Sequence, residues 1–135
     1  MAVATLMHIV GFLSRRYGQL ANPDSQALLR IAQAITFLER HYDQPVNLDK
    51  LASIAHMSER SFLREFKKAM GTSPIDYLIQ IRVTRAAEQL RHSDAAITKI
   101  AFELGFEDSN YFSRQFRKVM GVSPRQYRGQ FARDR

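Results

Sequence analysis

The same short segment occurs twice in this sequence, 50 residues apart. Residues 62–74 read FLREFKKAMGTSP, and residues 112–124 read FSRQFRKVMGVSP. Eight of the thirteen aligned positions are identical, which chance does not produce. Upstream the alignment continues at an offset of 49, where Leu51-Ala52 pairs with Ile100-Ala101. An internal repeat of this kind indicates that one helical unit is encoded twice.

Each copy has the pattern of a helix-turn-helix. A short apolar segment, Leu48–Ala55 or Ile97–Leu104, precedes a turn of three or four residues and a second, amphipathic segment. Residues that commonly cap helices stand at the two ends of both second segments: Ser58 and Asp108 at the start, Gly71 and Gly121 at the end. A Ser-Pro pair follows each glycine and predicts the start of the next helix.

The rest of the sequence also has helical spacing and shows no alternating strand pattern. Apolar residues recur at helical steps from Leu28 to Tyr42, and the segment between the repeats predicts a linker helix about 27 Å long. We therefore predict an all-α fold with one domain at residues 25–135. Its parts are a first helix-turn-helix (46–72), the linker helix (74–91), a second helix-turn-helix (96–122) and a C-terminal helix (124–131).

Residues 1–24 are expected to form an N-terminal amphipathic helix and a linker that is broken at Asn22-Pro23. The helical stripe consists of Val3, Leu6, Val10, Leu13, Tyr17 and Leu20. It either docks on the rest of the domain or forms the seam of a homodimer, and the spacing does not choose between them. The apolar part is too short to span a bilayer and lacks the pattern of a signal peptide, so we expect a soluble, cytoplasmic protein.

The composition narrows the classes of function. A chain of 135 residues holds one or two small packed units, and it contains no cysteine for thiolate metal sites or a Cys nucleophile. The four histidines, His8, His41, His56 and His92, are too scattered to suggest a metal site. We expect no enzymatic activity and no cofactor. Twenty Lys and Arg against 13 Asp and Glu give a formal net charge of +7, which favours a polyanionic partner.

The second helix of each copy places an apolar face opposite a basic face, at 100° per residue. The apolar faces consist of Phe62, Phe66 and Ala69 in the first copy and Phe112, Phe116 and Val119 in the second. The polar faces consist of Arg60, Arg64, Lys67 and Lys68, and of Asn110, Arg114, Arg117 and Lys118. One basic face alone is usually just solvated, but two matching faces on turn-linked helices favour DNA.

The chemistry of these faces suits the major groove of B-DNA, which is about 12 Å wide and admits one α-helix. Arginine bridges guanine O6 and N7, and asparagine pairs with adenine N6 and N7. We therefore predict base contacts from Arg60, Arg64, Asn110 and Arg114, with Leu63 and Ser113 beside them for a thymine methyl or a water-mediated contact. Phosphate contacts are predicted from Ser58, Lys67, Lys68, Arg117 and Lys118.

Several short motifs carry a family resemblance. In the second copy they are Ile100-Ala101, Gly105-Phe106, Tyr111–Arg114, Phe116-Arg117, Gly121–Pro124 and Tyr127-Arg128. In the first copy they are Leu51-Ala52, Met57-Ser58, Phe66-Lys67 and Gly71–Pro74. With these motifs the chain from about Leu28 to Phe131 resembles the DNA-binding domain of AraC/XylS-type transcription regulators. His56 departs from the family pattern, in which Gly is common at this position of the turn.

The resemblance implies two helix-turn-helix units joined by a long helix, an activator role and RNA polymerase as a partner. It also implies base contacts from Arg60, Leu63 and Arg64, and from Ser109, Asn110, Ser113 and Arg114. Typical members carry a ligand-sensing, dimerising domain before this one. Because residues 1–20 resemble the last helix of such a domain, we expect the chain to be a fragment.

Two other functions remain open from the sequence. A nonspecific architectural protein would bind any DNA duplex with similar affinity, through salt-dependent attraction to the phosphates alone. A helical adaptor would use the same basic faces to bind an acidic protein. Arg60, Arg64, Asn110 and Arg114 favour sequence-specific DNA binding, because an adaptor needs charge but no base-reading geometry.

Overall fold

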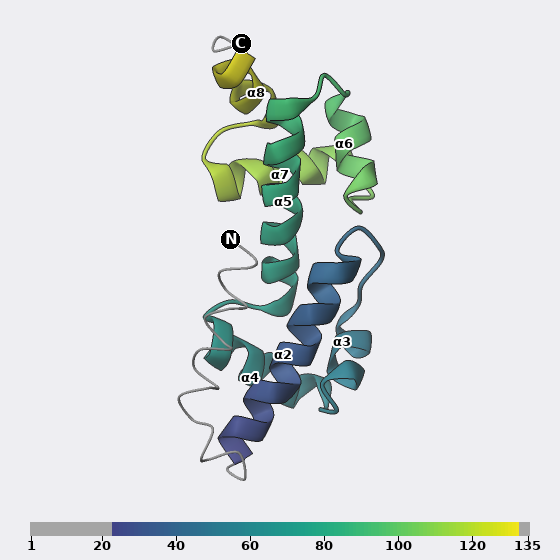
Figure 1. The fold of residues 1–135 in the computed structure, drawn as a ribbon, viewed down its shortest axis with the longest axis vertical. Coiled ribbons are helices and arrows are strands. Elements are labelled where there is room, and N and C mark those ends of the chain that lie inside the picture. The colour runs from purple at the N-terminus through teal and green to yellow at the C-terminus, as the bar shows by residue number, and fades with distance from the viewer. Residues whose placement is uncertain (1–22, 133–135) are drawn as a thin grey trace. The chain divides into compact units, whose positions relative to one another are not determined.

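The computed structural model describes residues 23–132 of the chain. These residues form only α-helices and turns, which confirms the predicted all-α class (Figure 1). The helices are α2 (Pro23–His41), α3 (Leu48–Ile54), α4 (Glu59–Met70), α5 (Pro74–His92), α6 (Ile97–Glu103), α7 (Ser109–Met120) and α8 (Pro124–Ala132). The linker helix and the C-terminal helix each extend one residue beyond the prediction. The predicted stripe from Val3 to Leu20 lies outside the described residues.

The helices belong to two compact units. The first contains residues 23–41 and 46–78, and the second contains residues 42–45 and 79–132. The helix α5 therefore begins in the first unit and continues in the second without interruption (Figure 1). Each unit contains one copy of the sequence repeat, so the duplicated segments correspond to two separate packed bodies.

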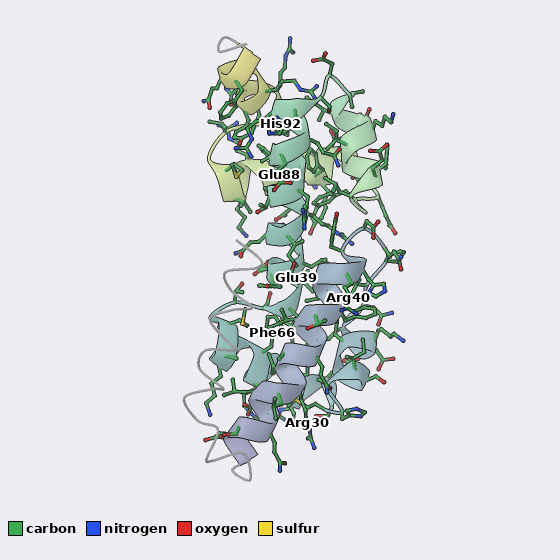
Figure 2. All side chains as sticks on the ribbon, viewed as in Figure 1. Arg30, Glu39, Arg40, Phe66, Glu88 and His92 are labelled. Atoms are coloured by element: carbon green, nitrogen blue, oxygen red, sulfur yellow. The ribbon has the colours of Figure 1, made fainter. Side chains whose placement is uncertain are left out.

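The first unit packs α2 against the two helices of its helix-turn-helix. Phe62 and Phe66 of α4 are fully buried, as are several aliphatic side chains of α2 and α3. The ring of Tyr77, on α5, meets the Phe66 ring edge-on at a centroid distance of 5.8 Å. Its hydroxyl donates a hydrogen bond of 2.9 Å to Glu39, which is labelled on α2 in Figure 2. Burial, reinforced by the Glu39 carboxylate, raises the pKa of Tyr77, so the phenol stays protonated.

The second unit repeats this arrangement with α6, α7 and α8 around the later part of α5. Phe112 and Phe116 of α7 are fully buried, and the Phe116 ring meets Tyr127 edge-on at 5.5 Å. Arg128 on α8 donates hydrogen bonds to the carbonyl oxygens of Leu90 and Ser93 at 3.3 and 3.2 Å. The repeated Phe and Tyr positions thus build the same edge-to-face contact in both cores, each a favourable aromatic geometry.

The helices α4 and α7 are capped by the residues that the sequence predicts. The Ser58 hydroxyl accepts a first-turn backbone N–H at 3.2 Å, and the Asp108 carboxylate accepts two, at 2.7 and 3.4 Å. Gly71 and Gly121 end the helices with φ of +74° and +82°, a left-handed conformation that favours glycine. Both helices therefore begin and end at defined residues, which fixes the side chains that each one exposes.

The two turns have the same backbone hydrogen bonds but different central residues. In the first, His56 N–H donates to Ser53 and Met57 N–H to Ala52, at 3.1 and 3.0 Å. In the second, the corresponding bonds from Gly105 and Phe106 have the same lengths. His56 adopts φ of +55°, so the departure from the family pattern leaves the turn intact. Histidine is among the residues that tolerate this left-handed region.

The turn of the second unit leaves no room for a side chain. Gly105 has φ of +96°, and a Cβ placed there would lie 2.9 Å from Arg82 Nη2 and 3.0 Å from the Asp43 carbonyl oxygen. Arg82 itself is only 9% exposed and donates to the carbonyl oxygens of Tyr42 and Gln44, at 2.6 and 3.0 Å. Burial lowers the pKa of this guanidinium, and the two carbonyl acceptors compensate part of its lost hydration. Sequence analysis did not identify this contact.

Candidate nucleic-acid interface

The structure leaves the polar faces of α4 and α7 on the surface of their units. Both helices bury their two phenylalanines completely and orient the opposite face outward. The exposed side chains include most of the predicted DNA-contacting set: Ser58, Arg60, Leu63, Arg64, Lys67, Lys68, Asn110, Arg114, Arg117 and Lys118. Ser109 and Ser113 are partly exposed. The set is thus sterically available, and its contacts with DNA stay a prediction.

Two of the four cations of α4, Arg64 and Lys68, lie near carboxylates. Arg64 Nε is 3.6 Å from Glu65 Oε1, and Lys68 Nζ is 3.8 Å from Asp24 Oδ1. The two cationic side chains are 67% and 66% exposed. Exposed ion pairs of this kind contribute at most about 1 kcal/mol, so a phosphate or a base edge can displace the carboxylate. Arg64 and Lys68 can therefore exchange their carboxylate neighbours for another anion with only a small loss of ion-pair free energy.

The helix α7 contains no acidic residue. Within residues 23–132, no carboxylate lies within ion-pair distance of Arg114, Arg117 or Lys118. Arg114 instead places its guanidinium carbon 6.0 Å from the centroid of the Tyr111 ring, a cation–π distance. The exposed face of α7 therefore has cations without paired carboxylates among the described residues, and one of its arginines lies against an aromatic ring.

The caps at the start of α4 and α7 limit what Ser58 and Asp108 can do. Both side chains already accept backbone N–H groups of the first turn. The Ser58 hydroxyl proton remains available to donate, which is compatible with the predicted phosphate contact. Asp108 acts as a cap through its carboxylate, whose charge also complements the positive end of the helix dipole.

Two other kinds of feature, a metal-binding group and a membrane-spanning helix, are not found in the part of the chain that the structure describes. Residues 23–132 contain no group of three His, Asp or Glu side chains arranged to hold a metal ion. The helices of this part are also too short or too polar to cross a membrane. The basic faces of α4 and α7 are accordingly the candidate site of the described residues.

Comparison with solved structures identifies close matches of the fold. The DNA-binding domain of the global transcriptional factor AdpA, solved with a target DNA, has a TM-score of 0.73 and 30% sequence identity, covering 78% of this chain and 95% of that one. A transcriptional regulator from Chromobacterium violaceum, described as containing an AraC-type DNA-binding domain, has a TM-score of 0.69 and 29% identity, with coverage of 76% and 92%. A family profile described as a helix-turn-helix domain matches residues 51–130.

The chain belongs to the AraC/XylS-type family. The curated relatives of this family include the HTH-type transcriptional activator RhaS of Klebsiella pneumoniae, which is 37% identical over 98 residues. That alignment covers 73% of this chain and 35% of RhaS. The chain therefore spans about a third of the length of the curated relatives it matches.

Proposed function

We propose that this AraC-type chain is a sequence-specific, double-stranded DNA-binding transcription regulator that reads two successive major-groove segments with α4 and α7. The observation that carries the proposal is the duplication of one device: a capped helix with two buried phenylalanines and an exposed basic face. The description of the AdpA domain as bound to a target DNA supports it. We assign no catalytic chemistry to the chain and expect it to act in the cytoplasm.

Within this function the polar faces divide into two roles. Side chains of the first two turns reach the base edges: Arg60, Leu63 and Arg64 on α4, and Ser109, Asn110, Ser113 and Arg114 on α7. Side chains at the helix start and in the last turns bind phosphates: Ser58, Lys67, Lys68, Arg117 and Lys118. The first group gives sequence preference, and the second adds affinity for any duplex.

The partners of the whole regulator are proposed from the family resemblance and from the sequence. Because RhaS is described as a transcriptional activator, we propose activation, through contact with RNA polymerase, as the role of this chain. We also propose a homodimer through the stripe of Val3, Leu6, Val10, Leu13, Tyr17 and Leu20. Substitution Leu13→Asp then converts a dimer to a monomer in sedimentation, whereas a monomeric unaltered chain rejects the dimer.

Selection of binding sites from random duplex tests the function directly. The full chain is expected to recover two short motifs at fixed spacing, bound on the order of 1,000-fold more tightly than random duplex. Equal affinity for selected and random duplexes would instead support an architectural protein. If the chain binds no duplex even at low salt, DNA binding is rejected and the adaptor for an acidic protein is favoured.

A further inference from the structure

An aromatic ring lies beside one proposed base-reading arginine. The guanidinium carbon of Arg114 is 6.0 Å from the Tyr111 ring centroid, within the range of cation–π contacts. Tyr111 is 37% exposed, so part of its side chain is accessible to solvent and to the guanidinium of Arg114. Both residues lie on α7, three positions apart, where side chains share one side of a helix.

The ring of Tyr111 packs against a buried aromatic side chain. Its centroid is 6.1 Å from that of Phe106, which is only 3% exposed. Phe106 packs edge-on against Phe112 at 5.0 Å, and the buried guanidinium of Arg82 lies 5.5 Å from the Phe106 centroid. Phe106 and its neighbours belong to the turn and core of the second unit. Their packing therefore restricts the position of the Tyr111 ring.

The first unit has no such arrangement. At the offset of 50 residues, Ser61 occupies the position of Tyr111 and Arg64 that of Arg114. Arg64 lies 3.6 Å from the partly buried carboxylate of Glu65 and has no ring contact among the described residues. The Tyr111–Arg114 contact is therefore not a general product of the repeat. It is a feature that the second helix-turn-helix has in addition.

We propose that Tyr111 is a positioning residue that orients Arg114 for base reading, an inference that rests on the proposed DNA-binding function. A guanidinium stacked on a ring keeps its edge N–H groups free, and these are the donors that guanine O6 and N7 accept. An arginine held in this way before binding loses less side-chain freedom when it enters the groove. The contact thus strengthens selectivity at one base pair and leaves phosphate binding unchanged.

Variants of the full chain test this through selectivity at the base pair that Arg114 reads. Tyr111→Leu removes the ring face and is expected to reduce the preference there roughly threefold to tenfold. Tyr111→Phe keeps the ring and is expected to retain the preference. In the Arg114→Ala background, Tyr111→Leu is expected to have no further effect, because its partner is absent. Thermal unfolding of each variant checks whether the fold is retained.

Several results would overturn the inference. If Tyr111→Leu costs as much in the Arg114→Ala background as alone, the ring contacts DNA itself. If it weakens specific and random duplexes alike, or if Tyr111→Phe loses the preference as well, the ring face does not orient Arg114. Should Tyr111→Leu fail to fold, Tyr111→Phe still decides, because a loss of preference there contradicts the stacking argument. An unaltered chain that binds without any base preference contradicts the proposed function instead.

Discussion

The two units are built from one repeat, and they agree in the interior and in most exposed cations but differ in other surface residues. Both bury a Phe pair and a Tyr in edge-to-face contact, and both end the exposed helix at a left-handed Gly. They differ in the turn, where His56 of the first unit corresponds to Gly105 of the second, and in the neighbours of their arginines. The residues that determine the fold match between the copies, and so do most exposed cations, whereas the turn residue and the neighbours of the arginines differ.

The largest expected effect tests whether the two cores are equivalent. Phe66→Ala and Phe116→Ala each remove a fully buried ring and are expected to lower the free energy of unfolding by about 3–5 kcal/mol. Urea unfolding measures the loss, and hydrogen exchange shows whether it stays within the unit that is mutated. Phe102→Ala is the control, because this ring is 56% exposed and its removal should cost under about 0.5 kcal/mol. Clearly unequal losses would contradict equivalent cores.

The turns are expected to respond in opposite ways. Gly105→Ala adds a Cβ into the Arg82 contact at a φ that favours glycine, so we expect a loss of about 2 kcal/mol or more. His56→Gly relieves left-handed strain but increases the freedom of the unfolded chain, so the net change should stay below about 1 kcal/mol. Thermal denaturation measures both. A Gly105→Ala protein as stable as the original would show that the second turn has spare room.

A pair of substitutions on α7 separates base reading from phosphate binding. Arg114→Ala is expected to cost about 1–3 kcal/mol at its preferred base pair and to relax selectivity there. Lys118→Ala should weaken binding to all sequences alike and reduce the salt slope by about one unit. Fluorescence anisotropy on matched duplexes over a salt series measures both quantities. Equal losses from Arg114→Ala on specific and random duplex would reject its base-reading role.

The smallest effect concerns the charges that distinguish the two exposed helices. Glu65→Gln removes the carboxylate beside Arg64 and is expected to strengthen binding to any duplex by about 0.2–1 kcal/mol, more at low salt. Gln115 occupies the matching position on α7, so Gln115→Glu should weaken binding by a similar amount. Titrations at two salt concentrations measure the change. The same sign for both substitutions would mean that this charge difference has no electrostatic role.

Sequence analysis predicted the parts of the fold that depend on local pattern. The repeat, the caps Ser58 and Asp108 and the C-terminal glycines define both helix-turn-helix units, and the linker helix is predicted to within one residue. These features depend on neighbours within one or two helical turns. Periodicity and propensity describe such neighbours directly.

Contacts between distant segments were not predictable in this way. Arg82 stands between Ile81 and Val83, and nothing in that spacing indicates that its guanidinium binds carbonyl oxygens about 40 residues earlier. Tyr111 was equally ambiguous, because its spacing suits either the core or the surface, and the structure leaves it partly exposed over Phe106. The DNA contacts of the exposed side chains remain predictions, since they depend on a partner and not on the fold alone.

Residues 42–45 belong to the second unit, and this limits how the chain can be divided into fragments. No single cut of the polypeptide separates the two bodies, because this tetrapeptide is encoded before α3 but is held by Arg82 on α5. A protein truncated after residue 78 would keep the tetrapeptide and lose its guanidinium. Half-length fragments would thus test a damaged surface, and the two halves are better compared by point substitution within the intact polypeptide.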